Sequence, residues 1–161
     1  MAVGSFEDLC AGFCDIVQVP PPALSVDAQG LVGFHVVMRG VTVNLVHCPQ
    51  TSPDHVFVVF ELGPIGQEGP ASFADLQTLL EANFMLLRVH PPVFSRNPAT
   101  GDAVLQYVCP LFDATPHSLY ELIDEGVDWV SRWSQRLSSG EAGDVHQDAA
   151  EGPATAMPNF A

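Results

Sequence analysis

Apolar residues recur at helical spacing near the start of the chain. Measured from Phe6, they fall 0, 3, 4, 7 and 11 positions along, which is one stripe of a helix with 3.6 residues per turn. The stripe consists of Phe6, Leu9, Cys10, Phe13 and Val17. Ser5 precedes it as a natural N-cap, and three consecutive prolines at 20–22 prevent its continuation. The pattern predicts a first helix over residues 5–17.

The next segments have the composition and alternation of β-strands. Residues 31–39 are rich in β-forming side chains, and residues 41–45 alternate apolar and polar ones. Residues 55–62 (HVFVVFEL) form the strongest strand pattern in the chain. Connections this short favour an antiparallel meander. Because 31–39 and 55–62 are apolar on both faces, either both faces are buried within the chain or one is left for a partner.

A second helix, two strands and a third helix complete the pattern. Ser72 is the expected N-cap of the second helix, and strands follow at 93–97 and 103–111. Thr115 as N-cap and Pro116 in the first turn predict a third helix that runs to Leu137. The apolar stripe of the second helix is Phe73, Leu76, Leu79, Leu80 and Phe84. The element order is therefore α-β-β-β-α-β-β-α, and we predict an α+β fold with one antiparallel sheet and three helices.

The composition changes after residue 137. Residues 1–137 carry all the predicted helices and strands, whereas 138–161 are dominated by Gly, Ala, Ser, Pro and acidic residues. A segment with so little apolar content does not bury enough surface to fold. We therefore expect one α+β domain over 1–137 and an acidic, disordered tail over 138–161.

The net charge of the chain limits which classes of molecule it can bind. The chain has 19 Asp and Glu against 5 basic residues, all arginine, and a formal net charge of -14. A surface this negative repels phosphate backbones and anionic lipid heads, so nucleic acid and membrane are poor partners. The charge serves either solubility alone or attraction of a basic segment of another protein. The start of the chain lacks a basic region before an apolar stretch, and no segment has the length of a membrane span, so we expect a cytoplasmic protein.

The sequence contains no established catalytic motif. The glycines of 63–70 do not have the spacing of a nucleotide-binding loop, and G-x-S-x-G, H-E-x-x-H and C-x-x-C are all absent. The best metal candidates are Cys10 and Cys14 on one helix, with His47, Cys48 and His55 on neighbouring strands. Buried free thiols on an apolar stripe more often act as small hydrophobic side chains. We therefore expect no enzyme activity, metal or cofactor, and keep a small thiol- or zinc-dependent enzyme as the alternative.

An ordered set of short motifs indicates a family. These are Leu80-Glu81-Ala82-Asn83-Phe84, then Asn97-Pro98-Ala99-Thr100-Gly101, then Val104-Leu105-Gln106, with Gly40-Val41-Thr42-Val43 and Leu62-Gly63-Pro64 upstream and Trp133 and Arg136 in the last helix. Together they resemble the class I type III secretion chaperones of the Tir chaperone (CesT) family, over about residues 6–137. The resemblance implies a homodimer in the bacterial cytoplasm that binds the N-terminal segment of a secreted effector. Such a chaperone would keep the effector soluble and secretion-competent without ATP.

The resemblance also implies where partners bind. The second helix and the following strand should form the dimer interface, with Leu76, Leu80, Phe84 and Phe94 as its residues. The first helix and the strands within 31–62 should face the effector, through Phe6, Phe13, Val36, Met38, Val43, Leu45, Val58 and Phe60. The pattern does not say which strand face is which. An adaptor of the same fold that binds a component of the secretion apparatus is the nearest alternative function.

Overall fold

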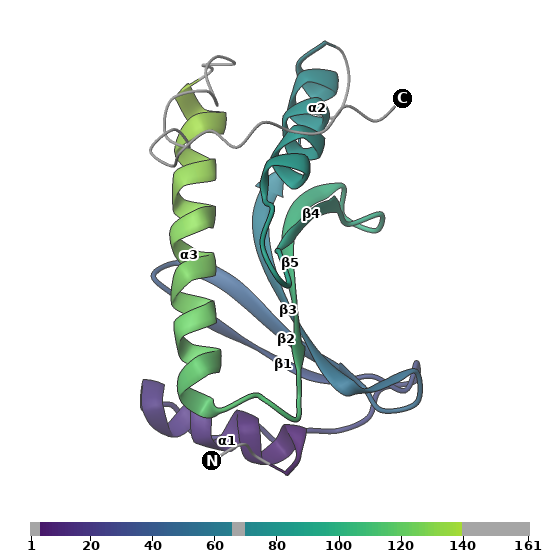
Figure 1. The fold of residues 1–161 in the computed structure, drawn as a ribbon, viewed down its shortest axis with the longest axis vertical. Coiled ribbons are helices and arrows are strands. Elements are labelled where there is room, and N and C mark those ends of the chain that lie inside the picture. The colour runs from purple at the N-terminus through teal and green to yellow at the C-terminus, as the bar shows by residue number, and fades with distance from the viewer. Residues whose placement is uncertain (1–3, 66–69, 140–161) are drawn as a thin grey trace.

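The computed structural model describes residues 4–65 and 70–139 (Figure 1). Its elements are α1 (Phe6–Val17), β1 (Val32–Met38), β2 (Val41–Cys48), β3 (Ser52–Pro64), α2 (Pro70–Met85), β4 (Val93–Arg96), β5 (Asp102–Pro110) and α3 (Pro116–Ser139). The strands form one sheet in the order β1-β2-β3-β5-β4, and every neighbouring pair is antiparallel. The α+β fold, its element order and its single antiparallel sheet are confirmed.

Capping explains where the helices begin and end. The Ser5 hydroxyl accepts a hydrogen bond from the Asp8 N–H at 3.1 Å, and Gln18 ends α1 in the left-handed conformation. Thr115 caps α3 in the same way through the Ser118 N–H at 3.0 Å. Helix α2 differs from expectation, because it begins at Pro70 and Ser72 lies inside it. Helix α3 passes the expected domain end and runs to Ser139, and the predicted acidic tail from 140 onward lies outside the described residues.

Helix α3 covers one face of the sheet (Figure 1). Helix α1 crosses the lower end of that assembly in the view, and α2 lies at the upper end beside β4. Alternate residues of the central strands turn toward α3 and form the core, among them Val43, Leu45, Val56, Val58 and Phe60, all completely buried. No described helix covers the opposite face over β1 to β3, where residues such as Thr42, Asn44 and Val46 remain half-buried. The sheet is therefore a single layer with one inner face.

Two contacts fix α3 on the sheet. A Cβ placed at Gly126 would come within 2.2 Å of the Phe60 ring, so the backbone of α3 rests directly on that ring. At the β1–β2 turn, the Arg39 guanidinium donates to the carboxylates of Asp124 and Asp128, each at 2.8 Å. The arginine and both aspartate side chains are about half exposed, so these ion pairs add little stability. Their main effect is to orient the turn.

The close packing at Gly126 predicts a stability effect. Alanine normally stabilises a helix relative to glycine, but at Gly126 the added methyl group would collide with the buried Phe60 ring. We expect Gly126→Ala to lower the free energy of unfolding by about 1–3 kcal/mol, measured by urea denaturation. Gly4→Ala is the control, since no atom lies within 4 Å of a Cβ there. Equal stability of the two variants would contradict the contact.

Candidate functional site

Most of the residues that the sequence assigned to effector contact lie in the core. Relative exposure is at most 1% for six of the eight, which pack between the sheet and helices α1 and α3. These six are Phe6, Phe13, Val43, Leu45, Val58 and Phe60. They offer no surface to a partner in this structure, and we correct the assignment for them accordingly. Residues 31–39 and 55–62 are apolar on both faces, and the sequence alone did not say which face the chain's own helices cover.

The other two residues, Val36 and Met38, lie on the edge strand β1. They share a side of that strand with Phe34, and all three are half-buried beside the core. Their cross-strand partners Leu45, Val43 and Val41 belong to the inner face, so the three side chains continue that face to the edge of the sheet. We call Phe34, Val36 and Met38 the β1 strip.

The outer edge of β1 is open along most of its length. On one side β1 pairs with β2 from Val32 to Met38. On the other side, the only bridge among the described residues joins Val26 to Val32 at the start of the strand. Beyond that bridge the outward backbone N–H and C=O groups are free to pair with an added strand. An open edge beside an apolar strip is the arrangement that accepts an extended peptide.

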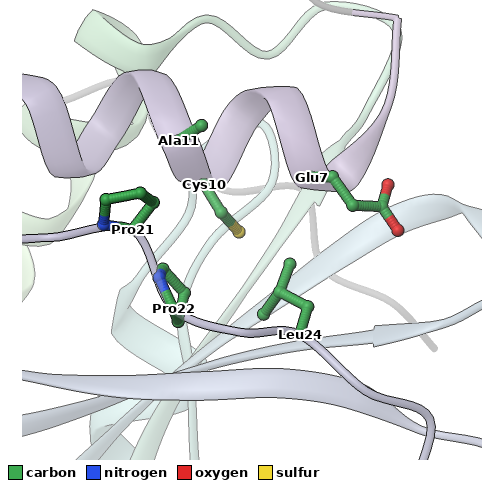
Figure 2. A pocket seen from close by; sticks show the side chains of 6 residues that line it. All are labelled: Glu7, Cys10, Ala11, Pro21, Pro22 and Leu24. Atoms are coloured by element: carbon green, nitrogen blue, oxygen red, sulfur yellow. The ribbon is translucent and has the colours of Figure 1, made fainter.

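A shallow hollow lies between α1 and the segment 21–24 (Figure 2). Its volume is about 280 Å³, and Cys10, Pro21, Pro22 and Leu24 form its apolar lining, with Glu7 at its rim. The segment that closes it continues to Val26, which bridges to the start of β1. The segment that borders the hollow therefore leads to the start of β1.

The predicted dimer residues separate into exposed and buried ones. Leu80 and Phe84 are 68% and 67% exposed, and Phe73 on the same side of α2 is 72% exposed. We call these three the α2 face. Leu76 is half-buried, and Phe94 is only 4% exposed because its ring packs 5.3 Å from that of Trp133. Of the four, Leu80 and Phe84 therefore offer a contact surface, and Phe73 joins them.

Asn83 fixes α2 to the second edge strand. Its side-chain oxygen accepts from the Phe94 N–H at 2.7 Å, and its amide nitrogen donates to the Phe94 carbonyl at 2.9 Å. These two bonds occupy the outward backbone groups of Phe94 as a neighbouring strand would. The two edges of the sheet are therefore different, since β4 is capped by a side chain where β1 is open. The sequence motif contained Asn83, but only the contact between α2 and β4 reveals its role.

The thiols and histidines named in the alternative enzyme hypothesis are packed as parts of the fold. Burial raises the pKa of the Cys10 thiol to about 12, and the neighbouring Cys14 and Glu7 add to the shift. The Cys14 pKa is also raised, mainly by burial. His47 stacks on Phe6 with ring centroids 5.2 Å apart, and its Nδ1 lies 3.0 Å from the His55 carbonyl oxygen. Within the described ranges, no three His, Cys, Asp or Glu side chains are placed to hold a metal ion.

The described helices include none that is both long and apolar enough to cross a membrane.

Comparison with known proteins gives a consistent result. The model of the Tir chaperone protein (CesT) family matches residues 9–134. A search of curated protein sequences gave no match. Among solved structures, the ExsC–ExsE complex is similar with a TM-score of 0.64 at 17% identity, over 83% of this chain and 97% of the other.

Two further structures have similar folds. The HopA1–SchA chaperone–effector complex has a TM-score of 0.58 at 15% identity, over 79% of this chain and 91% of the other. The Yersinia pestis type III secretion chaperone SycH, in complex with a stable fragment of YscM2, has a TM-score of 0.59 at 12% identity, over 81% and 100%. At sequence identities this low, the structural similarity shows a common fold and no more.

The raised thiol pKa values predict slow alkylation. Only the thiolate reacts, and a pKa near 12 for Cys10 leaves about a thousandfold less thiolate at pH 8 than the ordinary value of 9.0. Cys109, whose pKa burial raises to about 11, should also be protected. We expect iodoacetamide to label both sites slowly in the folded protein at pH 8, faster as the pH rises, and fully in urea, as measured by mass spectrometry. Rapid labelling of folded Cys10 would revive the thiol-enzyme alternative.

Proposed function

The chain belongs to the Tir chaperone protein (CesT) family, and we propose that it acts as a type III secretion chaperone that holds the N-terminal segment of a secreted effector. The family is one of chaperones, so the chain is a binding protein and not an enzyme. The similar HopA1–SchA structure is a chaperone–effector complex, and SycH is a type III secretion chaperone in complex with a protein fragment. The bound segment stays extended and competent for export, and no ATP is needed.

The open edge of β1 carries this proposal. An extended segment adds main-chain hydrogen bonds along β1, and alternate side chains of that segment enter the β1 strip and the hollow beside α1. The main-chain bonds supply affinity for many sequences, and the apolar strip selects among them. The segment loses conformational entropy when it is ordered, which keeps the complex reversible. Reversibility suits a cargo that must be released for export.

The net charge of -14 supports a basic segment as cargo. Among the described arginines, Arg39 and Arg88 are held in ion pairs with α3, and Arg132 stacks over the Trp129 ring at 4.9 Å. The chain has no lysine to offset its carboxylates. Association with a basic segment should therefore be fast at low salt and slower as salt screens the charges.

We also propose that two copies pair through the α2 face in the bacterial cytoplasm. Three large apolar side chains on one side of α2 form an unfavourable surface in water, and a second copy would cover it symmetrically. Asn83 holds α2 in place against β4, so that this face is presented on a rigid support.

An adaptor that binds a component of the secretion apparatus would use the same open edge. The two functions differ in the partner that co-purifies from the source organism. We expect a tagged copy to retain one dominant secreted protein through its N-terminal segment. Recovery of apparatus components alone would favour the adaptor.

The β1 strip predicts a face-specific effect on cargo binding. Val36→Glu places a charge within the strip, whereas Val37→Glu places the same charge on the other side of the strand, where the side chain is already 65% exposed. The ligand is the N-terminal segment of the co-purified effector. We expect Val36→Glu to weaken its binding at least tenfold, because the complex would bury an unpaired charge. We expect Val37→Glu to weaken binding less than threefold, on the order of an exposed substitution. Calorimetric titration measures both.

Circular dichroism of the two variants controls for folding, because Val36 is half-buried. Equal losses of affinity in two folded variants would remove the strip from the binding site. Unchanged affinity in both would place the cargo elsewhere on the chain.

The α2 face predicts the oligomeric state. Phe84→Asp would bury an unpaired carboxylate at the proposed dimer contact and should yield monomers in size-exclusion chromatography with light scattering. Phe112→Asp is the matched control, since Phe112 is also 67% exposed but lies in the turn after β5. We expect that variant to remain a dimer. A dimer that survives Phe84→Asp would exclude the α2 face.

A further inference from the structure

The turn that joins β1 to β2 has an unusual residue at its first position. Arg39 and Gly40 connect Met38 to its cross-strand partner Val41, and their φ angles are 49° and 81°. Two positive φ angles in a two-residue hairpin are typical of a type I′ turn, which prefers Asn, Asp or Gly at its first position. Arginine is disfavoured in this left-handed conformation because its Cβ crowds the backbone. The contribution of Arg39 therefore lies in its side chain.

The Arg39 side chain binds the middle of α3 through three hydrogen bonds. Its two terminal nitrogens donate to the carboxylates of Asp124 and Asp128 at 2.8 Å each, and one of them also donates to the Asp124 main-chain carbonyl at 3.0 Å. The two aspartates are four residues apart on one helix, where like charges repel, and the guanidinium bridges them. Lysine, with a single terminal nitrogen, does not form such a fork. The contact therefore fixes the direction of the turn relative to α3.

The end of the β1–β2 hairpin extends past the neighbouring strand. The pairing of β2 with β3 begins at Val43, opposite Phe60. In the part of the chain that the structure describes, Val41 and Thr42 pair only with β1. We call residues 37–42 the hairpin tip. A ribbon of two strands is marginally stable by itself in water, so the tip depends on its contacts with the body of the protein.

Two kinds of contact attach the hairpin tip to that body. Met38 packs beside the core and Val41 is only 9% exposed, so one side of the tip is held by apolar packing. Arg39 supplies the polar contact, beside the middle of α3 (Figure 1). Because Met38 belongs to the β1 strip, the orientation of the tip sets the orientation of that end of the open edge.

We propose that Arg39 is a positioning residue for cargo, which holds the hairpin tip on α3 so that the open edge of β1 keeps one orientation along its length. That a strand of cargo binds this edge rests on the proposed function. An added strand needs several consecutive N–H and C=O groups in line. If the tip is mobile, ordering it on binding costs conformational entropy and weakens the complex. Arg39 therefore acts on binding through the shape of the edge.

Arg39→Asn separates the side-chain contact from the turn. Asn-Gly is a preferred sequence for a type I′ turn, so the variant should form the turn at least as well while losing the bonds to α3. In the full chain without cargo, we expect ¹⁵N relaxation to show backbone order parameters in the hairpin tip falling from about 0.85 to about 0.7 or below. Residues 56–60 of β3 should stay near the rigid value, and the melting temperature should change by less than about 2 °C, since exposed ion pairs add little stability.

Arg88→Gln is the matched control. Arg88 follows α2 and pairs with Glu125 of α3 at 2.7 Å, with side chains 42% and 43% exposed, so a similar ion pair is lost away from the hairpin tip. This variant should leave the tip rigid. Asp124→Ala combined with Asp128→Ala removes both carboxylates and should loosen the tip. Arg39→Asn should then add less mobility than it does in the wild type, because the effects of contacting residues are not additive.

Cargo binding provides the second readout. With the N-terminal segment of the co-purified effector as ligand, Arg39→Asn should weaken binding about fivefold, the cost of ordering a mobile segment. The variant also removes a positive charge from a chain of net charge -14, which by itself would strengthen attraction to a basic segment. The expected loss is therefore opposite in sign to a general charge effect. Arg88→Gln removes the same charge and should not weaken binding.

Three outcomes would overturn the proposal. They are a tip that stays rigid in Arg39→Asn, a tip that loosens without loss of affinity, and a melting temperature lower by several degrees with β3 loosened as well. The last outcome would show a general structural role. The relaxation measurement needs no cargo, so a rigid tip in Arg39→Asn would leave the chaperone function intact. Absence of any co-purifying effector would instead count against the proposed function, and the order parameters would still show whether Arg39 holds the tip.

Discussion

The packing of α3 on the sheet determines what the rest of the molecule can present. Gly126 lets the helix backbone rest on the Phe60 ring, and this contact makes one face of the single-layer sheet the inner face. Val43, Leu45 and Val58 are then committed to the core. The exposed apolar side chains of α2 and the open edge of β1 lie at the margins of this core.

The element order was readable from the sequence because local rules govern it. Apolar spacing located all three helices, and Ser5 and Thr115 cap two of them as expected. Short connections predicted the antiparallel pairing of β1, β2 and β3, whereas the place of β5 beside β3 was not predicted. The start of α2 was missed by a few residues, because Ser72 resembles an N-cap although the helix begins at Pro70. Local patterns therefore define elements well and their ends less well.

The binding surfaces were harder to predict because they depend on contacts between distant residues. Because β1 and β3 are apolar on both faces, their sequence gave no sign of which face α3 would cover, and six core residues were taken for contacts. Gly126 was the available signal, since a glycine inside an amphipathic helix often marks a close approach. Leu80 and Phe94 looked alike in sequence, yet only the ring of Trp133 decides that Phe94 is internal.

The two bonds from the Asn83 amide of α2 to β4 make the edges of the sheet unequal as templates for a further strand. A sheet that accepts a strand at both edges is able to polymerise, because each added molecule exposes a new edge. Here the backbone of Phe94 is already saturated by Asn83, at the middle of a strand only four residues long. The β4 edge is therefore a poorer template for a further strand than the open β1 edge. This asymmetry favours the addition of a strand at one side of the sheet over growth from both sides.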